Sequence, residues 1–213
     1  MLVEKGDIMR GKGLSADAIT DAAFELLVEK GYGNYTVRDI AVRLNVRAAS
    51  LYNHIDGVES IDQEVGKRAA RILNETLTEA INGKEKEDAI EALAFAYRSF
   101  AQDNPQLYQA ILGLPGLGGN DELRKVGRES FQAFRQITNR YQISRETGVH
   151  FSRCYRSALH GFVSLMQSGY YANKSVDAEK TFRFLIRGYA RWLADLEQES
   201  IRRRENETPA DAK

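Results

Sequence analysis

The sequence has 213 residues, and its 30 Lys and Arg residues balance its 30 Asp and Glu residues, so no charged tail identifies a partner. The single cysteine, Cys154, excludes a disulfide framework and a Cys-rich metal site, and it fits a reducing compartment. No apolar run approaches the ~20 residues that span a bilayer, and no signal-peptide core opens the chain. We therefore expect a cytoplasmic protein that does not associate with membranes. The three prolines and the abundance of helix-forming residues favour an all-α fold.

The first 14 residues are polar and rich in glycine, which predicts a flexible arm. Its cations Lys5, Arg10 and Lys12 either reach DNA or belong to a solvated tail. Ser15 has the residue type that opens helices, and Gly31 the type that closes them. The buried face of the helix between them is predicted to consist of Ile19, Ala22, Ala23, Leu26 and Leu27.

The stretch 36–54 predicts two short helices joined by a tight turn. Thr36 and Asp39 have the spacing of a capping box, and apolar residues follow at helical spacing. Asn45 can adopt the left-handed conformation that ends the first helix, after which a second short helix begins. This is the geometry of a helix-turn-helix, although spacing alone fits a generic helical hairpin equally well.

Further helices are expected beyond this hairpin. A long helix should run from Val58 to about residue 82, where a glycine and a run of charges break the pattern. Pro105 suits the first position of a short helix. The other helices are expected at 88–102, 121–141, 146–168 and 176–203, with an irregular loop at 113–119 and a frayed tail at 205–213.

Two groups of residues resemble a known family. Thr36, Ile40-Ala41, Val46 and Leu51-Tyr52-x-His54 resemble the DNA-binding domain of the TetR family of bacterial repressors. The segments 96–101, 104–108 and 158–162 resemble a common TetR-type ligand-binding domain, which is named for a Trp-x-x-x-His-Gly motif. Here Arg156 stands in the place of the Trp, before His160-Gly161. The resemblance covers roughly residues 15–200.

The resemblance implies an N-terminal three-helix head that binds DNA and a C-terminal helical bundle that binds an effector and dimerises. The expected divisions are a flexible arm at 1–14, the helix-turn-helix domain at 15–62, the effector-binding and dimerisation domain at 63–204, and a disordered tail at 205–213.

The second short helix offers side chains for reading DNA. Arg47 can bind guanine bidentately, and Ala48 or Ala49 can contact a thymine methyl group. Tyr52 and His54 match family positions that contact the DNA backbone, although Tyr52 also suits a core position and His54 a helix cap. The full set of expected DNA contacts is Thr36, Arg38, Arg47, Ala48, Ala49, Ser50, Tyr52, Asn53 and His54.

Two departures from the family pattern concern DNA affinity. Val58 stands where the family usually carries a phosphate-binding Lys, and Arg47 stands where a Ser or Thr usually caps the second helix. Residues 1–75 contain 10 Lys and Arg residues against 12 Asp and Glu residues, a net charge of −2. We therefore expect weak non-specific DNA binding, because phosphate contacts supply most of that affinity.

The body of the chain favours ligand sensing over catalysis. Its histidines lack metal-binding spacing, no phosphate-binding glycine motif is present, and Cys154 is expected to be a small buried hydrophobe, so we expect no enzyme, metal or cofactor. A small, mostly apolar or aromatic effector is expected to enter near residues 113–119, although each lining residue also suits ordinary core. The expected lining is Tyr97, Phe100, Tyr108, Phe131, Phe134, His160 and Met166.

The last two helices are long and rich in aromatic residues. The resemblance implies that they form a four-helix bundle with a second copy, whereas periodicity alone equally allows a monomer core. The expected interface consists of Tyr155, Leu159, Phe162, Leu185, Tyr189 and Trp192. The functional expectation is a homodimeric repressor that binds a palindromic double-stranded operator and is released by its effector. A helical enzyme or interaction scaffold that keeps the hairpin for packing is the alternative.

Overall fold

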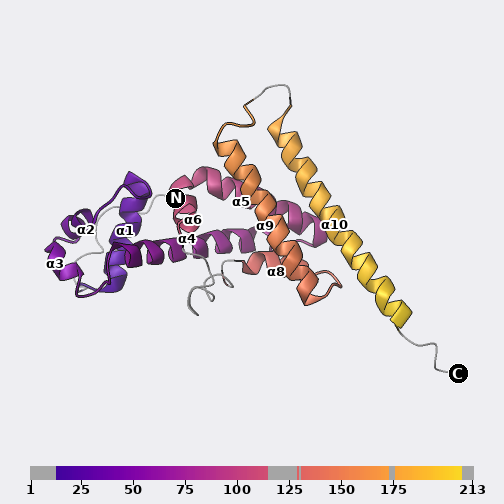
Figure 1. Ribbon diagram of the computed structural model, residues 1–213, viewed down its shortest axis with the longest axis horizontal. Helices are drawn as coiled ribbons and strands as arrows, with labels where there is room; N and C mark the ends of the chain where they lie inside the picture. Colours follow the sequence, from indigo (N-terminus) through magenta and orange to yellow (C-terminus); the bar gives the residue numbers. More distant parts are fainter. Residues whose placement is uncertain (1–12, 115–128, 130, 173–175, 208–213) are drawn as a thin grey trace. The chain divides into compact units, whose positions relative to one another are not determined.

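The computed structural model describes residues 13–114, 129, 131–172 and 176–207. All regular structure in these residues is helical, which confirms the all-α prediction (Figure 1). None of the helices within these ranges combines the length and apolar composition needed to cross a membrane. The described residues divide into two packing units. Unit 1 contains residues 13–69 and 106–114, and unit 2 contains the remainder.

Unit 1 is a helical head built on the helices α1 (Ala16–Lys30), α2 (Val37–Arg43), α3 (Ala48–Leu51), the first half of α4 (Val58–Ala80) and α6 (Pro105–Leu112). The Ser15 hydroxyl accepts a hydrogen bond from the Ala18 N–H at 3.2 Å, so Ser15 caps α1 as predicted. The helix ends at Gly31, whose φ of +95° is a backbone conformation that glycine adopts readily and other residues rarely adopt. All five residues predicted for its buried face are buried.

In the same unit, α6 lies close to α4 and to the end of α1. A Cβ atom on Gly66 would lie 2.9 Å from the backbone oxygen of Ala110, so α4 approaches α6 more closely than a side chain allows. The Gln106 side chain accepts a hydrogen bond from the Tyr32 N–H at 2.9 Å. These contacts hold the short helix that begins at Pro105 against the head.

Unit 2 contains the second half of α4, α5 (Lys86–Asp103), α8 (Gln132–Thr138), α9 (Arg145–Gln167) and α10 (Ala178–Glu207), and α5 contacts α8, α9 and α10. Most of these helices lie within a few residues of the predicted ranges. The expected frayed tail at 205–213 does not begin at residue 205, because α10 includes residues 205–207. The chain remains helical to Glu207 because residues 201–207 contain no proline or glycine and are mostly Arg and Glu, which favour helix.

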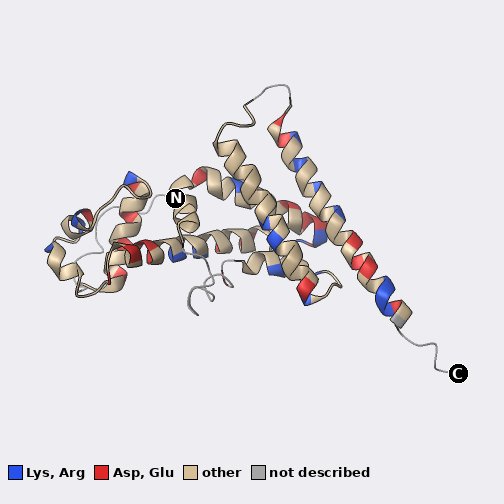
Figure 2. Ribbon diagram, viewed as in Figure 1, with Lys and Arg blue, Asp and Glu red and all other residues tan. Residues whose placement is uncertain are grey.

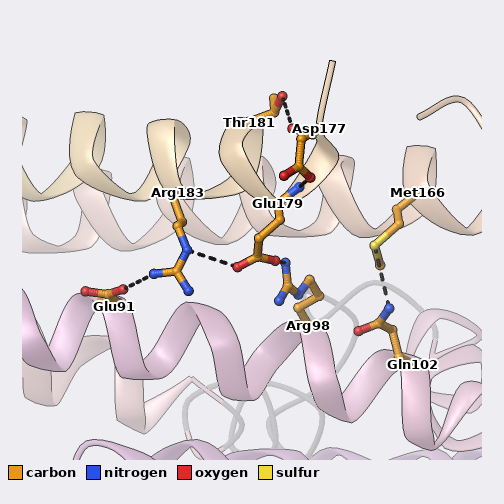
Figure 3. A network of polar contacts seen from close by, with 8 residues as sticks. All are labelled: Glu91, Arg98, Gln102, Met166, Asp177, Glu179, Thr181 and Arg183. Atoms are coloured by element: carbon orange, nitrogen blue, oxygen red, sulfur yellow. Dashed lines mark hydrogen bonds and ion pairs between the residues drawn. The ribbon is translucent and has the colours of Figure 1, made fainter. Parts of the chain in front are cut away.

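A ladder of alternating charges connects α5 to the start of α10 (Figure 3). Glu91 binds Arg183 at 3.0 Å, Arg183 binds Glu179 at 3.1 Å, and Glu179 binds Arg98 at 2.6 Å. The Arg98 guanidinium also lies 4.4 Å from the centre of the Phe182 ring. Because Arg98 is largely buried and contacts both an acid and a ring, it ties the two helices together more firmly than a surface ion pair does.

A second connection joins α5 to the far half of α10. The buried carboxylate of Glu197 accepts hydrogen bonds from the Lys86 ammonium group and from the Gln142 N–H, both at 2.8 Å. Burial by itself raises the pKa of Glu197, but these two hydrogen bonds outweigh it and hold the pKa below its ordinary value of 4.5. The charged carboxylate therefore stabilises unit 2 at neutral pH.

Replacing Glu197 with glutamine should lower the unfolding free energy of unit 2 at pH 7 by roughly 1–3 kcal/mol, because the hydrogen bonds lose their charged acceptor. The stabilisation exists above the ordinary carboxyl pKa of 4.5 and disappears as the pH falls through the lowered pKa of the folded protein. Urea titrations of both proteins between pH 7 and pH 3 should therefore converge at the acid end. Glu199→Gln, an exposed substitution in the same helix, is the control and should change little.

Candidate nucleic-acid interface

The first helix of the hairpin begins with the predicted capping box. The Asp39 N–H donates to the Thr36 hydroxyl at 3.2 Å, and the Thr36 N–H donates to the Asp39 carboxylate at 2.8 Å. Hydrogen bonds from the Lys30 and Thr36 side chains lower the pKa of Asp39 to about 2, so the carboxylate stays charged at neutral pH. The capping box and the pair with Lys30, 2.5 Å away, position α2 beside the end of α1.

The turn between the two helices has the predicted conformation. Asn45 has a φ of +53°, and the Val46 N–H donates to the Ala41 oxygen at 3.0 Å, which closes α2. The second helix, α3, covers only Ala48–Leu51, and no side chain caps it at Arg47. Leu51 is completely buried, so this single residue anchors α3 to the head.

The side chains predicted to contact DNA lie mostly at the surface of the head. Tyr52 is 58% exposed, which excludes a core role for its ring, and the His54 side chain is exposed as well. Ala48 and Ser50 are half-buried, so they are less accessible than Ala49 in the same helix. The remaining exposed members of the set are Thr36, Arg38, Arg47, Ala49 and Asn53.

The cations of unit 1 divide into paired and unpaired groups. Four of them form ion pairs with acidic residues of the same unit: Lys30 with Asp39, Arg43 with Glu25 and Glu29, Lys67 with Glu64, and Arg68 with Asp21. Arg38 and Arg47 are exposed and form no ion pair among the described residues. They lie in the first turn of α2 and at the cap of α3. The unpaired positive charge of the described part of the head is therefore confined to the hairpin.

The start of α4 offers no such charge. Val58 is the first residue of the helix and is 41% exposed. Acidic residues follow along its first turns (Figure 2). Exposed Asp56 precedes it, and exposed Glu59 comes directly after it. These carboxylates offset the attraction that a helix N-terminus has for anions, so this end of α4 is poorly suited to hold a phosphate.

Most of the predicted effector-binding side chains belong to unit 2, where several form an aromatic cluster. The Phe134 ring centre lies 6.4 Å from that of Tyr97, 6.3 Å from Phe131 and 6.1 Å from Tyr155. Tyr155, which the sequence assigned to the dimer interface, belongs to this cluster, and its hydroxyl donates to the Ile90 oxygen at 2.9 Å. Tyr155 follows Phe151 by four residues, and this helical spacing could have indicated that both side chains lie on one buried face of α9.

The other predicted members of the effector set have different surroundings. The guanidinium carbon of Arg156 lies 3.5 Å from the centre of the Phe131 ring, so the Arg156 side chain packs on an aromatic side chain. Burial and the Arg156 charge lower the pKa of His160, which favours a neutral imidazole at pH 7. Phe100 is buried and Met166 half-buried, both in unit 2, while Tyr108 is buried in unit 1.

The predicted dimer residues also divide by burial. Tyr155, Leu159 and Phe162 are at most 4% exposed within the single chain, so their side chains pack its own core. Leu185 and Tyr189 are half-buried, and Trp192 is 41% exposed. Leu165 and Phe184, which are not in the predicted dimer set, are 41% and 75% exposed. The helical phase was the available signal, because Phe184 lies opposite the buried stripe of α10 and Leu165 lies to the side of the buried stripe of α9.

Cys154 is exposed, so the expectation of a small buried hydrophobe was wrong. It precedes the buried Tyr155 by one residue, and a step of ~100° around the helix turns its side chain away from the core. Other expectations lie outside the described residues. They are the arm cations Lys5, Arg10 and Lys12, the part of the effector entrance at 115–119, and the part of the helix at 121–128.

Comparison with known proteins gives matches over both halves of the chain. The family model described as "Bacterial regulatory proteins, tetR family" matches residues 19–56, and "Tetracyclin repressor-like, C-terminal domain" matches residues 90–189. The chain is 30% identical over 172 residues to the uncharacterized HTH-type transcriptional regulator Rv0681 of Mycobacterium tuberculosis, covering 80% of this chain and 78% of that protein.

Two further relatives match at different levels. The negative transcriptional regulator IcaR of the biofilm operon in Staphylococcus aureus is 38% identical over 77 residues, which cover 36% of this chain and 40% of that protein. A TetR variant from Acinetobacter baumannii, solved in complex with minocycline, shares the fold with a TM-score of 0.60 at 19% identity, over 87% of this chain and 99% of that chain. The two family models and the match to the mycobacterial regulator over most of both chains agree with the observed hairpin. The chain belongs to the TetR family of helix-turn-helix transcriptional regulators.

Proposed function

We propose that this regulator is a homodimeric repressor, acting in the cytoplasm, that binds a palindromic operator and is released by a small, mostly apolar or aromatic effector. The observation that carries the DNA-binding part is the distribution of charge in unit 1. Among the described cations of the head, Arg38 and Arg47 alone lack an acidic partner, and both lie on the hairpin. Unpaired arginines at this position favour contacts with phosphates and with guanine.

In the proposed complex, α3 lies in the major groove. Arg47 binds guanine, Ala49 and the half-buried Ala48 lie near thymine methyl groups, and Asn53 adds a polar contact to a base edge. Arg38 and Thr36 bind phosphates at the start of α2, where the helix dipole also favours a negative group. Tyr52 and His54, which are both exposed, bind the DNA backbone after the end of α3. Ser50 lies in the sequence between the base-reading residues at 47–49 and these backbone-binding residues.

Replacing Tyr52 with phenylalanine should weaken operator binding by about 1 kcal/mol per half-site, because the variant loses one hydrogen bond from the hydroxyl to a phosphate. The reduction should be similar for operator and for mutated operator sequences, since phosphate contacts carry no base information. Fluorescence anisotropy against both DNAs measures it. Fold stability should stay unchanged because the ring is largely exposed, and a changed base preference would refute the backbone role.

The repressor assignment draws support from IcaR, which is named as a negative regulator and matches over 77 residues. The effector assignment draws support from the TetR variant solved with minocycline. In this chain the aromatic cluster around Phe134, together with half-buried Phe131, His160 and Met166, offers apolar surface to such a molecule. We assign the body to the Trp-x-x-x-His-Gly kind, with Arg156 stacked on Phe131 in place of the Trp.

The homodimer is proposed to form through the exposed faces of α9 and α10. Leu165 on α9 and Phe184 and Trp192 on α10 are large apolar side chains with at least 41% exposure. Gly161 and Gly188 lie on the same two helices, and a Cβ atom on either would meet nothing within 4 Å. Exposed aromatic residues next to open glycine positions are typical of surfaces that another protein covers.

Fluorescence anisotropy with the DNA upstream of the protein's own gene tests the proposal. The expected result is saturable binding that competitor DNA of random sequence does not abolish, with two subunits per operator. The double variant Arg38→Ala/Arg47→Ala is the control and should not bind. If the native protein shows no preference over random DNA, the alternative of a helical scaffold that uses the hairpin for packing is favoured.

A further inference from the structure

Arg156 places a positive charge beside the aromatic cluster of unit 2. Its guanidinium carbon lies 3.5 Å from the centre of the Phe131 ring, and the Phe131 ring centre lies 6.3 Å from that of Phe134. Arg156 is half-buried, and Phe134 is 2% exposed. A charge beside buried rings interacts with other charges more strongly than a surface charge does, because the local dielectric constant is lower.

The position of this guanidinium group on the ring is compatible with binding an anion. A guanidinium group contacts an aromatic ring through its flat face, whereas it donates hydrogen bonds to a carboxylate through its edge. Arg156 can therefore stay on Phe131 while two of its N–H groups bind the two oxygens of a carboxylate.

The charges of the surrounding helices favour an anion at this position. Within α8 and α9, which the structure describes along their whole length, Glu146 is the only acidic residue, whereas the two helices carry four arginines. Glu146 lies ten residues before Arg156, which is about 15 Å along the helix axis. Glu129 precedes α8 and is exposed. An anion beside Arg156 therefore faces two helices that are mainly positive.

We propose that the effector is a small aromatic acid, whose carboxylate is bound by Arg156 while its ring packs on the apolar surface of the aromatic cluster. This inference rests on the proposed effector-binding function and specifies the chemical class of the effector. A carboxylate suits the position better than a phosphate does. One half-buried guanidinium group can balance a single negative charge, whereas a phosphate group carries more charge and costs more to withdraw from water.

His160 provides a measure of the charge at this position. It follows Arg156 by four residues, so it lies one turn further along the same side of α9. Burial and the Arg156 charge lower the pKa of His160. A carboxylate bound to Arg156 opposes the second effect, so the pKa of His160 should be higher with an acid bound than with the neutral amide of the same shape. Proton NMR of the native protein from about pH 5 to pH 8 measures this difference, and His160→Gln identifies the resonance.

Matched pairs of acids and amides test the chemical class directly. The probes are benzoate and benzamide, phenylacetate and phenylacetamide, and cinnamate and cinnamamide, with binding to the native protein measured by isothermal titration calorimetry. At least one acid should bind about tenfold more tightly than its amide, because hydrogen bonds to a charged group are stronger than those to a neutral group.

Variants of α9 assign the preference to Arg156. Arg156→Gln should remove the preference for the acid, and Arg156→Lys, which keeps the charge without the planar group, should retain part of it. Arg153→Gln, an exposed substitution in the same helix, is the control and should leave the preference unchanged. Urea titrations verify that each variant is folded, and the NMR measurement on the native chain does not depend on them.

The outcomes separate this inference from the proposed function. If no acid binds more tightly than its amide, or if folded Arg156→Gln keeps the preference, the carboxylate assignment is wrong. An amide that releases the operator as readily as its acid, in the anisotropy assay, also overturns the assignment but leaves an effector-released repressor in place. A native protein without preference for its operator overturns the proposed repressor, while calorimetry without DNA still measures the preference for the acid.

Discussion

Replacing Arg47 with alanine is expected to weaken operator binding by roughly 1–3 kcal/mol per half-site and to relax the base preference at one position of each half-site. Arg47 is exposed at the cap of α3, has no acidic partner among the described residues, and is the side chain of that helix best able to bind guanine bidentately. Fluorescence anisotropy against operator variants with each base at each position measures both effects.

Arg38→Ala is the matched control because it removes the same charge from the other unpaired position of the hairpin. It should weaken binding to all sequences by a similar factor and reduce the salt slope by about 0.9 for each phosphate that the variant no longer neutralises. Equal behaviour of the two variants would contradict the assignment of Arg47 to base readout and would leave both as phosphate ligands.

Replacing Phe134 with alanine is expected to lower the unfolding free energy of unit 2 by about 3–5 kcal/mol. Its ring is 2% exposed and contacts the rings of Tyr97, Phe131 and Tyr155, so its removal leaves a cavity among three aromatic side chains. The ring centre of Trp192, the single tryptophan of the chain, lies 5.4 Å from that of Phe151 in the same unit. Its fluorescence during a urea titration therefore measures the unfolding of unit 2.

Tyr170→Ala removes an aromatic ring that is 71% exposed and should change stability by less than about 0.5 kcal/mol. A Phe134→Ala variant as stable as the native protein would show that this ring is not a structural centre of unit 2. If the variant is destabilised and a small aromatic compound such as benzene restores its stability, the cluster can accept an aromatic group, as the proposed effector requires.

Local patterns predicted the head better than the body. The capping box at Thr36 and Asp39, the left-handed Asn45 and the closing Gly31 are set by residues within a few positions of each other, and the structure shows all three as expected. The exposure of Tyr52 could not be derived in this way. Its neighbour Leu51 satisfies the packing requirement of a helix only four residues long, which leaves Tyr52 at the surface.

In the body, periodicity identified the apolar residues of α9 and α10 but not which face each one occupies. Tyr155 and Leu159 were expected at a dimer interface, yet both are buried by the helices of their own chain. A helix packed on one side by its own subunit and on the other by a second copy carries two apolar stripes, and a single sequence does not separate them. The Arg98 ladder and Glu197 were likewise overlooked, because their partners lie 81 and 111 residues away.

The pairing of most head cations with neighbouring acids has a consequence for how the regulator behaves among chromosomal DNA. A protein with a broad basic surface is held by the bulk chromosome, so most of its copies are occupied far from their targets. Here Lys30, Arg43, Lys67 and Arg68 are neutralised within the head itself. If the proposed operator binding holds, we expect a larger share of the copies to remain unbound, so that few molecules suffice to keep one promoter occupied.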